Sequence, residues 1–109
     1  MENVEKKRNQ TAFLVLLALS SGPKHGYDIS KFIEEKTKGF FRLPFGSLYP
    51  VLHKLEKEKL IHATWQDKDT QKPRKVYNVT DKGRKATHDE VSLYKNYTSA
   101  LNRLISSET

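Results

Sequence analysis

The side chains that could take part in catalysis are scattered along the chain. The four histidines are His25, His53, His62 and His88. None has a second histidine at the i, i+4 spacing of a helical zinc site, and there is no cysteine to complete a tetrahedral site or to act as a nucleophile. Asp67 and Asp69 lie in a polar stretch typical of a turn. We therefore expect no enzyme activity, no metal site and no cofactor.

Residues 46–57 carry side chains that suit binding rather than catalysis. With 100° per residue of helix, Leu48, Val51, Leu52 and Leu55 share one side, together with Lys59. The opposite side carries hydroxyl, aromatic and basic groups that can reach base edges and phosphates. These residues are Ser47, Tyr49, Pro50, His53, Lys54 and Lys57. The alternative is an ordinary solvated helix face, but an exposed Tyr and Pro in the first turn favour a binding surface.

A second candidate binding segment is a polar turn between two stretches of strand character. Residues 70–80 contain three basic residues, Lys72, Arg74 and Lys75, and no acidic one. This pattern predicts a hairpin with a basic tip that binds phosphates or enters a minor groove. The alternative is a solvated hairpin whose lysines discourage edge pairing.

The overall charge agrees with a polyanionic partner. Twenty Lys and Arg against 13 Asp and Glu give the 109-residue chain a net charge of +7. Such a balance favours double-stranded DNA or another nucleic acid over an acidic membrane surface. The longest apolar run, residues 12–19, is too short to span a bilayer, and the lack of cysteine suits a reducing compartment. We expect a cytoplasmic protein with no membrane partner.

Three short helices, a two-stranded hairpin and a long helix must position these residues. We expect helices at residues 10–20, at 27–38 and after an N-cap at Ser47, then strands at 60–65 and 76–79. Thr80 is the expected N-cap of a last helix that ends near residue 106. This order predicts a mainly α fold with a small β-hairpin, a winged helix-turn-helix. Its expected parts are an N-terminal extension (1–9), a DNA-binding domain (10–80) and a C-terminal dimerisation helix (81–109).

The last helix has more apolar surface than one small domain can cover. Exposed, this surface would be an association site, and a two-fold dimer would bury it against the apolar first helix. The expected interface residues are Phe13, Leu16, Leu17, Val91, Tyr94, Tyr97, Leu101, Leu104 and Ile105. The alternative is a helix that folds back on its own domain. A rival function is a winged-helix module that binds a partner protein without DNA.

Several motifs in a fixed order resemble the PadR family of bacterial transcriptional regulators. They are SGPKHGYDI at 21–29, GSLYPVL at 46–52, LE at 55–56 with LI at 60–61, RKVY at 74–77 and TDKG at 80–83. The resemblance implies a homodimeric repressor of the short-tailed subfamily, which has a single C-terminal dimerisation helix and binds a dyad operator.

The resemblance also implies roles for individual residues. Ser47, Tyr49 and Lys54 would contact DNA from the third helix, and Lys24 and Tyr27 would meet phosphates. Lys72, Arg74 and Lys75 would serve the wing. Some relatives bind a small aromatic effector between subunits, and Tyr94 is either the residue that lines this pocket or a plain interface residue. The chain departs from the family pattern at three positions. Lys59 replaces a helix-ending glycine, Pro73 stands in a wing that lacks the usual glycines, and Val76 replaces an aromatic residue.

Overall fold

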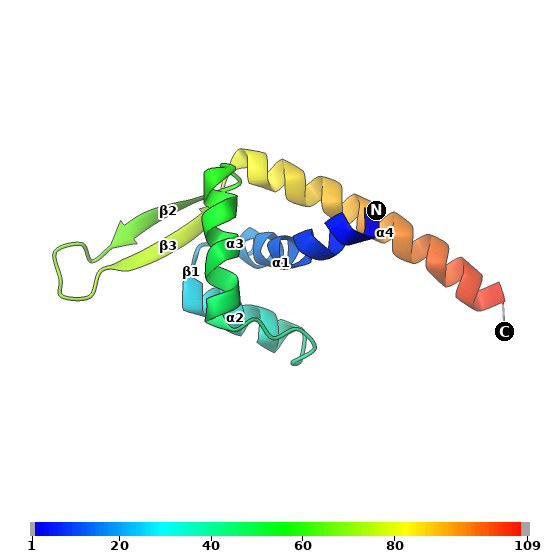
Figure 1. Cartoon of the computed structure of the whole chain (residues 1–109), viewed down its shortest axis with the longest axis horizontal. Coiled ribbons are helices and arrows are strands. Elements are labelled where there is room, and N and C mark those ends of the chain that lie inside the picture. The colour runs from blue at the N-terminus through cyan, green and yellow to red at the C-terminus, as the bar shows by residue number, and fades with distance from the viewer. Residues whose placement is uncertain (1, 108–109) are drawn as a thin grey trace.

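The computed structural model describes residues 2–107, with side chains from Gln10 onward. Its elements are α1 (Glu2–Ser20), β1 (Lys24–His25), α2 (Gly26–Lys36), α3 (Phe45–Lys57), β2 (Ile61–Gln66), β3 (Arg74–Val79) and α4 (Asp81–Ser107). The expected winged helix-turn-helix with a long last helix is confirmed. Figure 1 shows α3 crossing in front of α1, with the β2–β3 wing and α4 extending to opposite ends.

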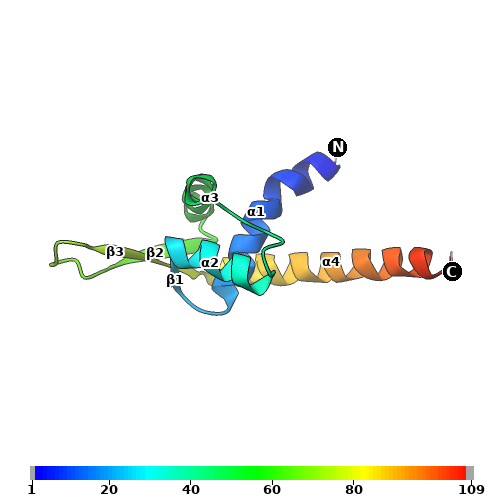
Figure 2. The same cartoon turned by 90° about the horizontal axis from the view of Figure 1, so that it is seen from below.

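The core lies where α1, α2 and α3 meet the base of the sheet. Its most deeply buried side chains come from all of these elements. They are Val15, Leu19, Ile29, Leu48, Leu52 and Ile61. The wing and the outer part of α4 lie outside this core, which gives extents of 61 × 28 × 24 Å. In Figure 2, wing and α4 lie along one line, and the N-terminal part of α1 projects on the side of α3.

The sheet contains a third strand that the sequence did not predict. β1 pairs antiparallel with β3, which puts Lys24 opposite Tyr77 and His25 opposite Val76, and β2 pairs with the other edge of β3. β1 is only two residues long, so it has no alternation pattern to detect. The expected two-stranded hairpin is therefore a three-stranded sheet at its base.

Two helices begin earlier than expected. α1 begins at Glu2 rather than near Gln10, so the expected extension at residues 2–9 continues this helix, whereas Met1 lies outside the described residues. α3 begins at Phe45 with Pro44 as its N-cap, because the N–H groups of Ser47 and Leu48 both donate to the Pro44 carbonyl. The expected N-cap at Ser47 is wrong. Pro50 is consequently the sixth helical residue, and the Gly46 carbonyl lacks its usual helical donor.

The end of α3 has the geometry that glycine usually provides. Lys59 has φ +63°, and it follows the C-cap Glu58 in a Schellman motif, in which Lys59 N–H donates to Glu56 and Leu60 N–H to Leu55. Lys59 therefore takes the left-handed conformation at the position where the family pattern has glycine. A non-glycine residue in this conformation carries a conformational cost of about 1 kcal/mol.

Lys59→Gly is therefore expected to stabilise the protein by about 1 kcal/mol, since glycine adopts positive φ without a steric cost. The measurement is the urea midpoint of unfolding followed by circular dichroism. Lys57→Gly, inside α3, is the control and should destabilise by a similar amount. A midpoint that falls for Lys59→Gly would contradict the expectation.

Candidate nucleic-acid interface

α3 presents one apolar and one polar side, as its spacing predicts. Leu48, Leu52 and Leu55 are buried against the core. The side that faces solvent consists of exposed residues that the sequence singled out for binding. These are Ser47, Tyr49, Pro50, His53, Lys54 and Lys57. Donors, acceptors and two cations on one exposed helix face suit contacts to base edges and phosphates.

α2 adds an exposed aromatic residue beside the start of α3. Tyr27 is 70% exposed, and it lines a surface hollow together with Pro44 and Phe45, which lead into α3. Phe45 in turn packs against Tyr49, with ring centroids 6.1 Å apart. The structure thus brings Tyr27 next to the start of α3, where Phe45 contacts Tyr49 of the polar face.

Lys24 does not join this surface with its charged group. Its ammonium donates to the Ala18 carbonyl (2.9 Å), the Ser21 hydroxyl (2.6 Å) and the Gly22 carbonyl (3.2 Å). It also lies 4.3 Å from the Phe32 ring centroid. Burial lowers the pKa of Lys24, against the opposing effect of Asp28. The three donors of the ammonium are occupied, so its contacts are those of a cap at the end of α1 rather than a phosphate contact.

The loop of the wing is electrically neutral. Residues 67–73 connect β2 to β3, and the charges of Lys68 and Lys72 cancel those of Asp67 and Asp69. Asp67 has φ +56°, and its carbonyl accepts from the N–H and hydroxyl of Thr70, which closes the turn without glycine. The expected basic tip is therefore wrong in detail. The excess positive charge lies on the arm, where β3 begins with Arg74 and Lys75.

Arg74 and Lys75 both make contacts within the subunit, on opposite faces of β3. An Arg74 guanidinium nitrogen lies 3.4 Å from His25 Nδ1, which is also 3.4 Å from an Asp28 carboxylate oxygen. Lys75 Nζ lies 3.5 Å from Glu56 Oε1 on α3. The sequence did not predict His25 and Glu56 as partners of the wing. His25 lies 49 residues before Arg74, and Glu56 lies 19 residues before Lys75.

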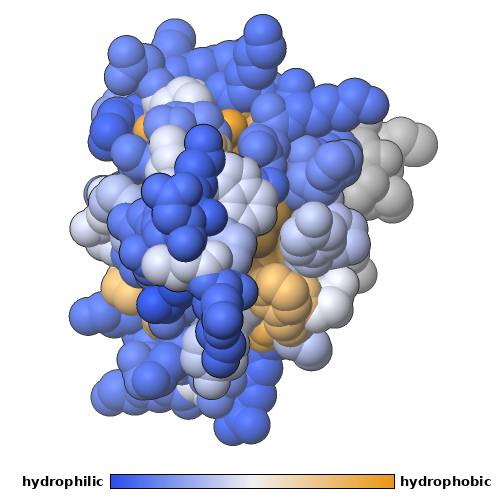
Figure 3. Space-filling view, turned by 90° about the vertical axis from the view of Figure 1, so that its left-hand side faces the viewer, coloured by the Kyte–Doolittle hydropathy of each residue, from blue (hydrophilic) through white to orange (hydrophobic). Residues whose placement is uncertain are grey.

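The wing end of the molecule is mostly hydrophilic, as Figure 3 shows. The apolar side chains proposed for dimer contact lie elsewhere. On α4, Tyr94, Tyr97, Leu104 and Ile105 are each more than half exposed, Leu101 is 40% exposed and Val91 is half-buried. Leu93, 64% exposed, extends this surface and was missed because it lies at its edge.

The three α1 residues proposed for the interface have different environments. Leu17 is 39% exposed and Phe13 is half-buried, so both have surface to offer a partner. Leu16 is only 2% exposed and belongs to the core of its own subunit. Leu16 therefore stabilises the fold of its own subunit and has almost no exposed surface left for contact with a second chain.

The described residues contain neither a membrane-spanning helix nor a cluster of metal ligands. Residues 2–107 contain no helix long and apolar enough to cross a bilayer. Among the side chains described from Gln10 to Ser107, no three His, Asp or Glu come close enough together to hold a metal ion.

Comparisons with known proteins identify the family. The chain is 31% identical over 77 residues to the negative transcriptional regulator PadR of Bacillus subtilis. The matched region covers 71% of this chain but only 42% of that protein. The solved PadR-like transcriptional regulator of Bacillus cereus superposes with a TM-score of 0.76 at 27% identity, covering 92% of this chain and 94% of the other. The structure of Bacillus subtilis PadR in complex with operator DNA gives 0.67 at 30% identity, covering 72% and 45%.

The family model described as the transcriptional regulator PadR-like family matches residues 15–89. This range runs from the middle of α1 through the wing to the first turns of α4. It contains the buried core, the polar face of α3 and the whole wing. The chain therefore belongs to the PadR-like family of transcriptional regulators.

Proposed function

We propose that this protein is a homodimeric, sequence-specific DNA-binding regulator of transcription. In this proposal α3 lies in the major groove, with Ser47, Tyr49 and Lys54 toward the bases, and Tyr27 and the wing contact the flanking backbone. The observation that most strongly supports this proposal is the exposed polar face of α3 in a member of a transcriptional-regulator family. The proposal includes no catalytic step, and it implies that the protein works beside the chromosome, in the cytoplasm of a bacterium.

The direction of regulation follows by analogy with the Bacillus subtilis relative, which is named a negative regulator and has been solved on operator DNA. A repressor of this kind binds a dyad site with two α3 helices about one DNA turn apart. Dimerisation through α4 and α1 would supply that pair of helices.

The proposal is tested by DNA binding at one fixed, moderate salt concentration. The duplex is the region upstream of the protein's own gene, and a scrambled duplex of equal length is the reference. We expect the upstream duplex to bind at least about 1,000-fold more tightly. Equal affinities would contradict the proposal and favour a winged-helix module that binds a partner protein instead.

Lys54→Ala is expected to weaken binding to the upstream duplex by about tenfold or more, because one base or phosphate contact is lost. Lys85→Ala is the matched control, since it removes one positive charge from an exposed position on α4, where the Lys85 side chain is 80% exposed. The control should change affinity less than about twofold. Equal losses in the two variants would assign the effect to net charge alone.

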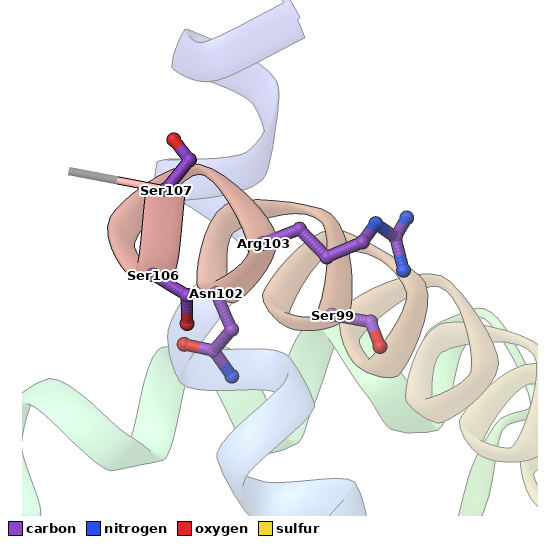
Figure 4. A pocket seen from close by; sticks show the side chains of 5 residues that line it. All are labelled: Ser99, Asn102, Arg103, Ser106 and Ser107. Atoms are coloured by element: carbon purple, nitrogen blue, oxygen red, sulfur yellow. The ribbon is translucent and has the colours of Figure 1, made fainter. Parts of the chain in front are cut away.

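An effector site at Tyr94 remains a separate prediction. Tyr94 is 57% exposed, so its ring is available to a flat aromatic compound held between two α4 helices. The hollow that Figure 4 shows near the end of α4 is a different place, lined by polar side chains of that one helix, among them Asn102, Arg103 and Ser106. Tyr94→Ala should abolish binding of such a compound, as titration calorimetry can show.

A further inference from the structure

A half-buried ion pair joins the wing to α3. Lys75 Nζ on β3 lies 3.5 Å from Glu56 Oε1 on α3, and the two side chains are 31% and 32% exposed. Most lysines of this chain are exposed, so a lysine held between two elements differs from them. Ion pairs at half-buried positions are less screened by salt than those on the open surface.

Two aromatic rings hold the same ammonium from the wing. Trp65 is the direct partner of Lys75 across the β2–β3 ladder, and its ring centroid is 5.9 Å from Lys75 Nζ. Tyr77, two residues further along the same face of β3, is 5.5 Å away. Both distances are within the range of cation–π attraction. Lys75 therefore contacts β2, β3 and α3 at once.

Glu56 lies on the side of α3 that faces the wing. Tyr49, His53 and Glu56 follow one another at i, i+4 and i+7, so they form one stripe on the helix. Tyr49 and His53 belong to the exposed face proposed to contact DNA. A carboxylate at the end of this stripe would repel a phosphate backbone unless a cation neutralised it.

We propose that Lys75 is a positioning residue that fixes the wing against α3 through Glu56 and neutralises this carboxylate, rather than a phosphate contact of the wing. The proposal rests on the proposed DNA-binding function. It differs from the role that the family resemblance implies for Lys75. Phosphate contact from the wing then belongs to residues such as Lys72, which is exposed in the loop and whose ammonium makes no ion pair with the side chains described from Gln10 to Ser107.

The first test is the salt dependence of DNA binding for Lys75→Met, Glu56→Gln, the double variant and the matched control Lys72→Met. Each phosphate contact adds about 0.9 to the slope of log affinity against log salt. Lys72→Met should reduce the slope by about this amount. Lys75→Met should weaken binding about fivefold with an unchanged slope, and the double variant should bind no more weakly than Lys75→Met. Lys75→Arg should restore most of the affinity.

The second test uses the free protein and needs no DNA. Trp65 is the single tryptophan, so its emission reports on the wing alone. We expect Lys75→Met and Glu56→Gln to shift this emission, because the cation near the indole is removed or released, whereas Lys72→Met leaves it unchanged.

The outcomes separate this inference from the proposed function. A lower salt slope for Lys75→Met, equal to that of Lys72→Met, would overturn the positioning role. Identical Trp65 emission in all variants would also overturn it, whether or not the protein binds DNA. If wild type binds no duplex, the proposed function fails, while a Trp65 shift confined to Lys75→Met and Glu56→Gln would still support the link between wing and α3.

Discussion

Gly83→Ala is expected to destabilise the protein by about 3 kcal/mol or more. Gly83 is buried in the first turn of α4, directly against the backbone at Leu60. A Cβ atom there would lie inside the contact radius of the Leu60 carbonyl oxygen and 2.7 Å from a Val79 methyl group. Both neighbours would have to move.

The surroundings of Gly83 have little freedom to make room. The Leu60 carbonyl accepts from the backbone N–H of Thr80 at 3.0 Å, and the Thr80 hydroxyl donates to the carbonyls of Lys59 and Leu60. The same hydroxyl oxygen accepts from Gly83 N–H at 3.0 Å, which caps α4 as the sequence predicts. These bonds tie the end of α3 to the start of α4. A methyl group at Gly83 would therefore disturb several hydrogen bonds together.

The measurement is equilibrium unfolding in urea, followed by circular dichroism, for wild type and variant. Gly46→Ala is the matched control, because Gly46 is also helical but a Cβ there meets no atom within 4 Å. The control should stabilise the protein by about 0.5–1 kcal/mol through helix propensity. If Gly83→Ala unfolds at the wild-type urea midpoint, the expected clash between a Cβ atom at residue 83 and the Leu60 backbone is contradicted.

The helices and their buried sides were predictable because apolar spacing alone determines which side of a helix can face a core. Leu48, Leu52 and Leu55 are buried as this reasoning requires. The start of α3 was not predictable in the same way. Ser47 is a good N-cap by residue type, but the Pro44 carbonyl accepts the first helical bonds, so the helix begins before Ser47. Short polar residues fit a cap and a first turn equally well.

The third strand was missed for a different reason. β1 has two residues, and it exists because the free edge of β3 lies next to the chain between α1 and α2. No local pattern encodes such a pairing, because the tertiary arrangement places the two segments together. A strand shorter than about four residues is therefore too short to be recognised from the alternation of apolar and polar side chains.

The candidate site was predictable as a set of exposed residues but not as a set of contacts. The polar face of α3 follows from periodicity, and its residues are exposed as expected. The sequence predicts Lys24 and Lys75 to be free surface charges. In the structure, however, Lys24 caps the end of α1 and Lys75 pairs with Glu56. Long flexible side chains choose partners by tertiary proximity, which spacing along the chain does not show.

Leu101→Arg is expected to convert the proposed dimer into a monomer and to weaken binding to the upstream duplex by about 100-fold or more. From Ser92 onward, α4 lies almost wholly outside the core, and its apolar side remains exposed in the single subunit. Leu101 lies near the middle of that side. The charge of an arginine at this position would lose its hydration in any interface that buries the side chain, which costs free energy. Losing one subunit removes half of the contacts to a dyad site.

The mass in solution is measured by sedimentation at micromolar concentration. Wild type should have about twice the 12.6 kDa of one chain, and Leu101→Arg about 12.6 kDa. The variant should remain folded, because Leu101 is 40% exposed and makes no part of the domain core. A variant that stays dimeric, or a monomer that keeps full affinity for DNA, would contradict the proposed role of α4.

Ser99→Arg separates the effect of the apolar side from the effect of added charge. Ser99 is exposed on α4, and helical spacing places it on the side opposite Leu101. Both variants add one positive charge to the same helix, so both should gain equally in general attraction to DNA. Because only Leu101→Arg alters the apolar side, loss of the dimer and of affinity in that variant alone would show that the proposed DNA-binding unit is two chains joined through this side of α4.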